Sequence, residues 1–190
     1  MSSNISRFMC GALLVTATSL GGCATYKPAP PAFHEILTTP YHLDSGDKVR
    51  VSVFEQGDLT NTYLVDKAGY IAFPLVGSVP ARGRTVKQVE ADIARRLAKD
   101  YLRDPDVSAE IDRYRPFYIM GEVGAPGQYT YVAGMTVQNA IAAAGGFSPR
   151  ANQKAVDITR NINGKVITGR VPITDPIMPG DTIYLRERLL

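Results

Sequence analysis

Side chains that commonly catalyse reactions are few in this sequence, and they are not spaced for catalysis. The histidines are His34 and His42, and a pair of carboxylates, Asp104 and Asp106, flanks Pro105 just before a predicted strand. An aspartate beside a proline is typical of a turn, whereas a hydrolytic pair needs a defined separation in space. The sequence has no Gly-x-Ser-x-Gly elbow, no His-Glu-x-x-His motif and no glycine-rich phosphate loop. We therefore predict no catalytic residue, no metal site and no cofactor.

Cys23 stands in a context that does predict a covalent modification. Arg7 precedes an almost wholly apolar segment, residues 8–20, which is too short to span a bilayer as a stable helix. The run Leu20-Gly21-Gly22-Cys23 follows and resembles a bacterial lipobox, where signal peptidase cleaves before the cysteine and acyl chains are attached to its sulfur and new amine. We predict a signal peptide over residues 1–22 and lipidation of Cys23. The alternative is an ordinary secretory signal with an incidental cysteine.

The predicted lipid anchor bears on location and partners. Residue 24 is alanine rather than aspartate, which in the lipoprotein pattern implies sorting to the outer membrane, with the protein facing the periplasm. Two or three acyl chains hold a protein firmly, at about 0.8 kcal/mol per buried methylene. The other cysteine, Cys10, leaves with the signal peptide, so no disulfide is expected. The formal net charge of +3 is too small to indicate a nucleic-acid partner.

Residues 23–40 separate the predicted anchor from the first periodic segment. Prolines recur in this stretch, at positions 28, 30, 31 and 40. Proline-rich chain is stiff and extended, so we predict a spacer. Packing of this stretch along its own domain or a neighbour's is the alternative.

A first unit is predicted over residues 41–114. The alternation in residues 49–54 indicates a half-buried strand after a Gly46-Asp47 turn, and residues 63–65 and 70–73 are expected to pair around a turn. Thr85 and Gln88 have the spacing of a capping box. They start a helix that we expect to end at Asp104-Pro105, followed by a strand over residues 107–111. The apolar face of this helix consists of Val86, Val89, Ile93 and Leu97.

A second unit, residues 115–190, repeats part of this design. Residues 134–140 align with residues 83–89, each a glycine loop, a threonine cap and a helix start, and Gly145-Gly146 ends the second helix. Strands are predicted over residues 117–120, 155–159, 166–167 and 182–185. Pro126-Gly127 predicts a turn with glycine at positive φ, and Asn163-Gly164 predicts a hairpin turn. The predicted fold class is α+β, with two small mixed units.

The two units share a second short motif. Pro179-Gly180-Asp181 precedes the closing strand as Ser45-Gly46-Asp47 precedes the first. Glycine permits the backbone bend and aspartate can bond nearby amides. We therefore expect Gly46, Asp47, Gly180 and Asp181 to form turns rather than to bind a ligand.

Several of these runs resemble a known family. Residues 41–54, 69–77 and 101–105 resemble the polysaccharide export domain of outer-membrane capsule and exopolysaccharide export lipoproteins. Residues 116–185 look like the SLBB domain that follows it, a β-grasp-like soluble ligand-binding unit. The marks of the SLBB domain are Met120-Gly121-Glu122-Val123, Pro126-Gly127-Gln128-Tyr129, Ala143-Ala144-Gly145-Gly146 and Pro179-Gly180-Asp181. The domains are thus assigned as polysaccharide export, 41–114, and SLBB, 115–190.

The resemblance implies transport rather than catalysis. It implies a homo-oligomeric ring through which a polysaccharide leaves the periplasm, working with an inner-membrane polysaccharide co-polymerase. Such a ring requires a head-to-tail interface whose rotation closes. Long members of the family end in an amphipathic helix that crosses the outer membrane. This sequence resembles the short members, so a separate outer-membrane β-barrel protein is a further expected partner.

A glycan-binding or scaffolding lipoprotein that forms no conduit is the alternative function. The ten tyrosines could stack on sugar rings. Most of them fall in predicted strands, however, where tyrosine is an ordinary core or pleat residue.

Overall fold

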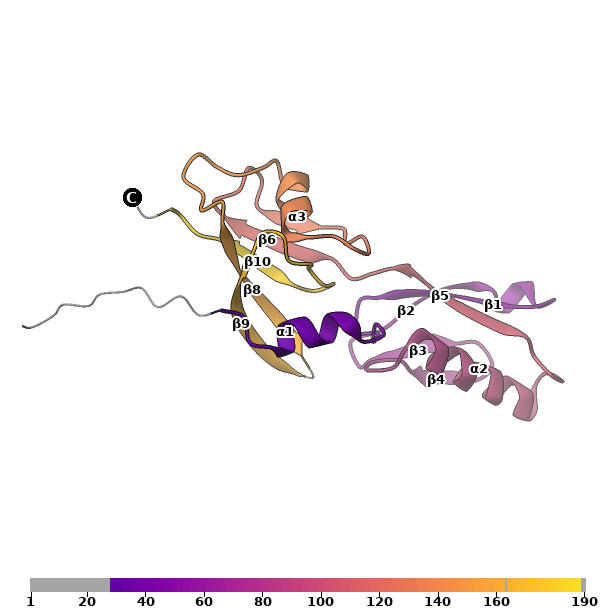
Figure 1. Cartoon of the computed structure of the whole chain (residues 1–190). Helices are drawn as coiled ribbons and strands as arrows, with labels where there is room; N and C mark the ends of the chain where they lie inside the picture. The colour runs from indigo at the N-terminus through magenta and orange to yellow at the C-terminus, as the bar shows by residue number, and fades with distance from the viewer. Residues whose placement is uncertain (1–27, 163, 189–190) are drawn as a thin grey trace, which may run out of the picture.

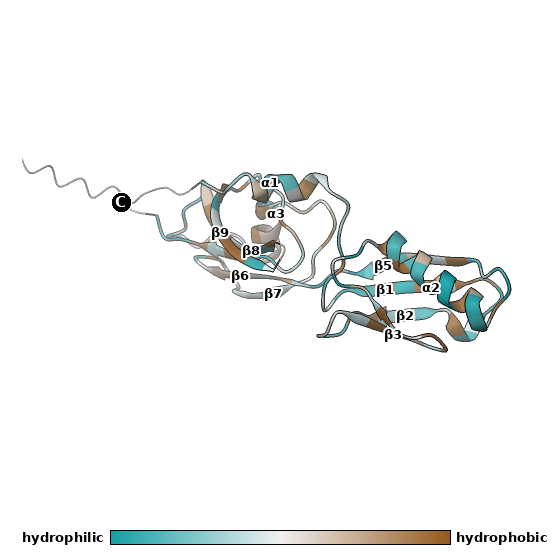
Figure 2. Ribbon diagram, turned by 90° about the horizontal axis from the view of Figure 1, so that it is seen from below, coloured by the Kyte–Doolittle hydropathy of each residue, from teal (hydrophilic) through white to brown (hydrophobic). Residues whose placement is uncertain are grey.

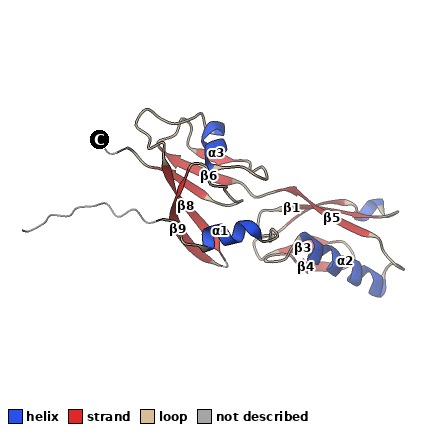
Figure 3. Ribbon diagram, in the orientation of Figure 1, coloured by secondary structure: helices blue, strands red, loops and turns tan. Residues whose placement is uncertain are grey.

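The computed structural model of this chain describes residues 28–162 and 164–188, which form two units arranged end to end (Figure 1). Each unit combines strands with a helix (Figure 3), and each has its own buried hydrophobic cluster. The predicted α+β class is confirmed. The predicted signal peptide and Cys23 lie outside the described residues.

A three-stranded antiparallel sheet in the order β2-β1-β5 forms the centre of the first unit. The alternating valines of the central strand point into the core, as predicted, and Val49 and Val51 are completely buried. A separate two-stranded hairpin, β3-β4, and the helix α2 complete this unit. Its elements are β1 (Lys48–Val53), η2 (Gly57–Leu59), β2 (Asn61–Leu64), β3 (Tyr70–Phe73), β4 (Gly77–Pro80), α2 (Val86–Asp100) and β5 (Val107–Arg113).

The predicted pairing of residues 63–65 with residues 70–73 is wrong. The short helix η2 reverses the chain so that β2 returns along β1, and β3 pairs with β4 instead. The two segments meet at a single isolated bridge between Val65 and Ile71. The local turn signal was sound, since Asp66 accepts the N–H of Tyr70, but the strands on either side of it belong to different sheets.

Helix α2 begins as predicted and ends earlier than predicted. The Thr85 side chain accepts the N–H of Gln88, and the Gln88 side chain accepts the N–H of Thr85, which completes the capping box. The last helical residue is Asp100, because the Leu97 carbonyl accepts the N–H of both Tyr101 and Leu102 and closes the helix there. The exposed length of α2 is largely hydrophilic (Figure 2).

The second unit is a five-stranded mixed sheet in the order β7-β6-β10-β8-β9. Its first and last strands, β6 and β10, are parallel neighbours in the middle, and antiparallel strands flank them. Helix α3 covers one face, which is the arrangement expected of a β-grasp-like unit. The elements are β6 (Phe117–Gly121), β7 (Gly127–Tyr129), α3 (Val137–Ala143), β8 (Ala155–Ile162), β9 (Lys165–Pro172) and β10 (Thr182–Leu185).

The helix signals of the second unit are confirmed, and one turn prediction is wrong. Thr136 and Asn139 form the capping box of α3, and Gly145 and Gly146 leave the helix at positive φ. Gly127 does not adopt positive φ; it begins strand β7 and pairs with Ile119. Strands β8 and β9 pair as a hairpin up to Ile162 and Lys165, whereas Asn163 of the predicted turn lies outside the described residues.

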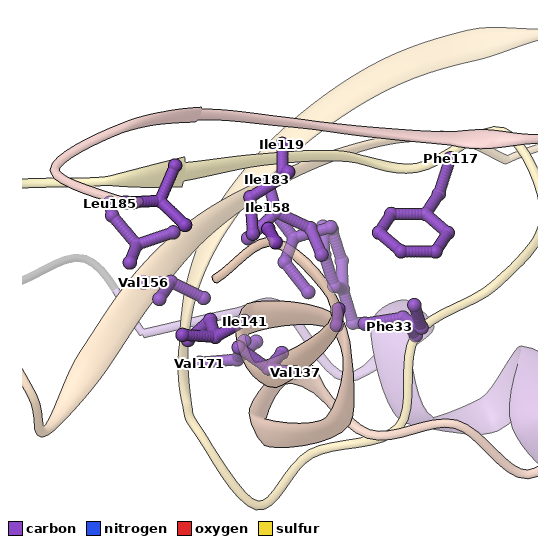
Figure 4. Packing of buried hydrophobic residues seen from close by; sticks show 14 of the residues in the cluster. Phe33, Phe117, Ile119, Val137, Ile141, Val156, Ile158, Val171, Ile183 and Leu185 are labelled. Carbon is purple, nitrogen blue, oxygen red and sulfur yellow. The ribbon is translucent and has the colours of Figure 1, made fainter. Parts of the chain in front are cut away.

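The chain before the first unit packs on the second unit. Residues 28–38 were predicted to lie in an extended spacer, but they contain α1 (Ala32–Glu35) and η1 (Ile36–Thr38). The N–H of Ala29 donates to the Arg170 carbonyl at the edge of β9. Phe33 is 1 % exposed and lies in the same cluster as residues of α3 and the sheet (Figure 4). For residues 28–38 the structure therefore agrees with the alternative prediction, in which this stretch packs against its own chain.

Close approach of this segment depends on Gly169. A Cβ at Gly169 would lie 2.7 Å from the Cα of Ala29, and real Cβ atoms essentially never come that close to backbone.

Among the helices of the described residues, none combines the length and the hydropathy needed to cross a bilayer.

Replacing Phe33 with alanine tests this packing. Because Phe33 is buried among residues of the second unit, Phe33→Ala should lower the free energy of unfolding by about 3–5 kcal/mol. Urea denaturation, with hydrogen exchange of the β8 and β9 amides, measures this change. The matched control is Phe54→Ala, whose side chain is 69 % exposed and whose loss should cost less than about 0.5 kcal/mol. Equal, small effects of the two substitutions would restore the extended-spacer interpretation.

Candidate functional site

Several residues singled out in the sequence have structural roles in the described regions. Asp104 and Asp106 are exposed on the turn before β5, and the Asp106 carbonyl accepts the N–H of Phe54. His34 Nε2 lies 2.9 Å from Asp175 Oδ2 at the surface. No group of three or more His, Cys, Asp or Glu side chains within residues 28–162 and 164–188 could hold a metal ion. Cys23, the predicted lipidation site, lies outside these ranges.

The two Gly-Asp turns have the same internal geometry. Gly46 and Gly180 both adopt positive φ, at 95° and 84°. Asp47 Oδ2 accepts the N–H of Asp44 at 2.8 Å, and Asp181 Oδ2 accepts the N–H of Met178 at 2.7 Å. The turn-forming role predicted for these residues is confirmed by these bonds. The aspartates do more than close turns, however, since they are 0 % and 1 % exposed and each is paired with an arginine.

Asp181 is paired with Arg160 inside the second unit. Arg160 Nε donates to Asp181 Oδ1 at 2.9 Å, and its Nη2 donates to Asp181 Oδ2 at 2.7 Å. The remaining nitrogen, Nη1, donates to the Phe33 carbonyl, and the guanidinium lies 4.9 Å from the centre of the Phe33 ring. Burial raises the pKa of the Asp181 carboxyl, and the hydrogen bonds and charge of Arg160 oppose that rise. This pair therefore fixes α1 onto the second unit.

Asp47 is paired with Arg115, which lies in the linker between β5 and β6. The Arg115 N–H donates to Asp47 Oδ1 at 2.8 Å, and its Nη1 donates to Tyr41 Oη at 2.9 Å and to Asp47 Oδ2 at 3.4 Å. The Tyr41 hydroxyl in turn donates to Asp47 Oδ2 at 2.7 Å. A carboxylate with this many donors is well compensated for its removal from water.

The same linker is bonded to the second Gly-Asp turn. The Gly180 N–H donates to the Pro116 carbonyl, and the Tyr118 N–H donates to the Asp181 carbonyl. Gly180 adopts positive φ, and a Cβ there would lie 2.5 Å from Arg115 Nε, so a larger residue would have to displace the guanidinium. Arg115 thus lies between the two Gly-Asp turns and joins the units.

Three tyrosine rings continue this joint. Tyr41 and Tyr114 meet edge to face with ring centres 5.0 Å apart, and Tyr114 and Tyr131 meet in the same way at 5.2 Å. Tyr41 belongs to the first unit, Tyr114 to the linker and Tyr131 to the second unit. Burial raises the pKa of all three hydroxyls, so they stay neutral at physiological pH. Pairs of this geometry add about 0.5–1.5 kcal/mol beyond the area they bury.

A cleft of about 590 Å³ opens beside this joint. Its walls come from both units and from the linker, and its lining includes Tyr41, His42, Asp44, Arg82, Arg115, Arg160, Asn161 and Met178. Arg82 Nε donates to Asp44 Oδ1 at 3.0 Å across one wall, and Arg82 also contacts Ser45. The lining of the cleft combines hydrogen-bond donors and acceptors with apolar surface from side chains such as Met178 and Pro179.

Comparison with protein families matches the described units in order. Residues 37–112 match the model described as polysaccharide biosynthesis/export protein, and residues 116–170 match the SLBB domain. The chain therefore contains a polysaccharide biosynthesis/export domain followed by an SLBB domain. These two matches confirm the resemblance to polysaccharide export proteins that was inferred from the sequence.

The names of three curated relatives of the chain refer to the production, export or transport of polysaccharides. The chain is 36% identical over 118 residues to the exopolysaccharide production protein ExoF of Rhizobium meliloti, covering 56% of this chain and 28% of ExoF. It is 29% identical to the EPS I polysaccharide export outer membrane protein EpsA of Ralstonia nicotianae, covering 79% and 48%. It is 28% identical to the polysialic acid transport protein KpsD of Escherichia coli, covering 95% and 32%. The chain thus spans between 28% and 48% of the length of these relatives.

Sequence reasoning missed the arginines at the joint between the two units. Arg115 and Arg160 lie in no recognisable motif, and an isolated arginine in a linker or a strand usually reads as a solvated side chain. The repeated Gly-Asp pair was the available signal, because a buried aspartate in each turn requires a cation nearby.

Substitution of Arg115 tests its role at the joint. Because Asp47 is completely buried, Arg115→Ala should lower the free energy of unfolding by about 3 kcal/mol. Arg115→Lys keeps the charge without the forked donor and should fall between the alanine variant and the wild type. The control is Arg82→Ala, which removes a half-exposed ion pair with Asp44 and should cost no more than about 1 kcal/mol. Urea denaturation of the three variants decides, and equal losses for Arg115→Ala and Arg82→Ala would contradict the assignment.

Proposed function

We propose that this chain is a component of a polysaccharide export machine in the outer membrane, anchored by a lipid on Cys23 and facing the periplasm. The observation that carries the proposal is the ordered match to the export and SLBB models. The relatives named as polysaccharide export and polysialic acid transport proteins support it. Export moves a finished polymer, so the role requires a shaped passage and no catalytic side chain.

The joint between the two units suits a protein that repeats as a subunit around a ring. A closed ring forms only if each subunit presents its two contact surfaces at a fixed angle. Arg115 and the tyrosine rings hold the two units together through hydrogen bonds and ring contacts at the junction. A subunit built in this way can repeat the same contact around a ring.

Exposed apolar side chains on different parts of the molecule support a homo-oligomeric ring. In the first unit, Leu75 and Tyr101 line a shallow hollow and are 54% and 50% exposed. Leu75 is held there at a positive φ of 67°, a costly conformation for leucine. In the second unit, Tyr118, Met120 and Tyr184 lie on the sheet face opposite the core. A head-to-tail interface needs two different surfaces of this kind.

The proposed machine has further components. An inner-membrane polysaccharide co-polymerase would deliver the polymer, and a separate outer-membrane β-barrel protein would complete the path. Both would be recovered with the chain after cross-linking in intact cells.

Deleting the gene for this chain tests the proposal. Export of surface and secreted polysaccharide should be lost in the deletion strain. Wild-type protein should restore it, whereas Cys23→Ser should not, because that variant cannot carry the thioether-linked lipid. The measurements are polysaccharide outside the cell and the membrane fraction in which each protein is found.

Two outcomes would overturn parts of this proposal. Normal export in the deletion strain would remove the transport role, and normal outer-membrane fractionation of Cys23→Ser would remove the anchor. Closed rings in electron micrographs of the purified lipoprotein are the expected assembly. A monomer with glycan affinity would instead favour a binding or scaffolding lipoprotein.

A further inference from the structure

The cleft beside the joint has the size of a small-ligand site. Its volume of about 590 Å³ lies within the range of about 300–1,000 Å³ that such sites occupy. The segment Tyr41–Asp44 forms one wall, Arg115 lies at the junction, and Asn161 and Met178 contribute from the second unit. A ligand there would contact both units at once.

The charges around the cleft are balanced. Arg82 is paired with Asp44, Arg115 with Asp47 and Arg160 with Asp181. Asp44 lines the cleft itself, whereas Asp47 and Asp181 are buried behind its wall. Each of the three guanidinium groups is therefore already compensated by a carboxylate. This balance favours a neutral ligand over a uronate or a phosphate.

One ion pair in the cleft, Arg115 and Asp44, keeps hydrogen-bonding capacity on both of its facing atoms. Arg115 Nη2 lies 3.7 Å from Asp44 Oδ2, which is too long for a direct hydrogen bond. The Asp44 side chain is 32% exposed and that of Arg115 is 19% exposed, so a ligand can reach both. A hydroxyl group is both donor and acceptor. It could accept from the guanidinium and donate to the carboxylate, which a purely anionic or cationic group could not do.

Apolar surface lies next to these polar groups. The Tyr41 ring and the Met178 side chain are both partly exposed and line the same cleft. A sugar ring presents hydroxyls at its edge and C–H groups on its face, so it matches a wall that has both kinds of surface.

We propose that this cleft binds one neutral, hydroxyl-bearing sugar residue, held by Asp44 and Arg115. The inference rests on the proposed function and deepens it, because it identifies where a polymer would contact the joint between the two units. It also assigns the sugar as uncharged.

The test is a titration of the purified full chain with single sugars. The probes are the methyl glycosides of glucose, galactose, mannose and rhamnose, with glucuronate as the anionic comparison. The readout is the NMR shift of backbone amides around residues 41–44, 115 and 161. At least one neutral glycoside should produce saturable shifts there, and glucuronate should not.

The Asp44→Asn variant tests the role of the Asp44 carboxylate in binding. It keeps the shape and an oxygen for Arg82 and Ser45, but it can replace the acceptor facing Arg115 with an N–H donor. Affinity for the glycoside should fall about tenfold or more. The matched control, Asp100→Asn, removes the same charge from an exposed carboxylate of α2 and should leave affinity unchanged. Thermal unfolding of both variants shows whether the fold is retained.

The outcomes separate this inference from the proposed function. No shift with any neutral glycoside, preference for glucuronate, or equal affinity of Asp44→Asn and wild type would each overturn the cleft assignment. If the deletion strain still lost export, the transport role would stand without it. If the deletion strain exported normally, the transport role would fall whatever the titration gave.

Discussion

Burial of the Asp47 carboxylate is the constraint on which the arrangement of the two units depends. Moving an ionised carboxylate out of water costs several kcal/mol unless charge and hydrogen bonds compensate it. At Asp47 the compensation comes from two separate stretches of chain: the segment that holds Tyr41 and the Asp44 backbone, and the linker that holds Arg115. Since Arg115 lies in the short linker between β5 and β6, meeting this requirement also fixes the direction in which the chain enters the second unit.

The second unit meets the same requirement from a different source. Asp181 has the same turn as Asp47, but its arginine comes from β8, and this guanidinium also holds the Phe33 carbonyl. One turn therefore joins the two units and the other joins α1 to its sheet. The two turns lie against the same linker, so the whole described chain is connected through them.

Local signals in the sequence predicted much of the fold. The starts of α2 and α3 were predictable because each cap involves residues three apart, and the central strands because alternation is local. The burial of Phe33 was not predictable, because it depends on Arg160, a partner 127 residues away. The prediction that β2 pairs with β3 failed for a related reason, because a turn signal does not indicate which sheet each strand joins. Arg115 could not be told from a solvated arginine until the turn that it contacts was placed.

With the proposed lipid on Cys23, the contact between Ala29 and the edge of β9 would limit how far the protein can lie from a membrane. Pro28 lies five positions after Cys23, and five residue steps of fully extended chain span no more than about 18 Å. A lipid on Cys23 would therefore hold the β9 edge close beneath the bilayer surface. The first unit lies at the other end of the molecule (Figure 1) and would be directed away from that surface. In the proposed export role, a polymer coming from the periplasm would then meet the first unit before the second.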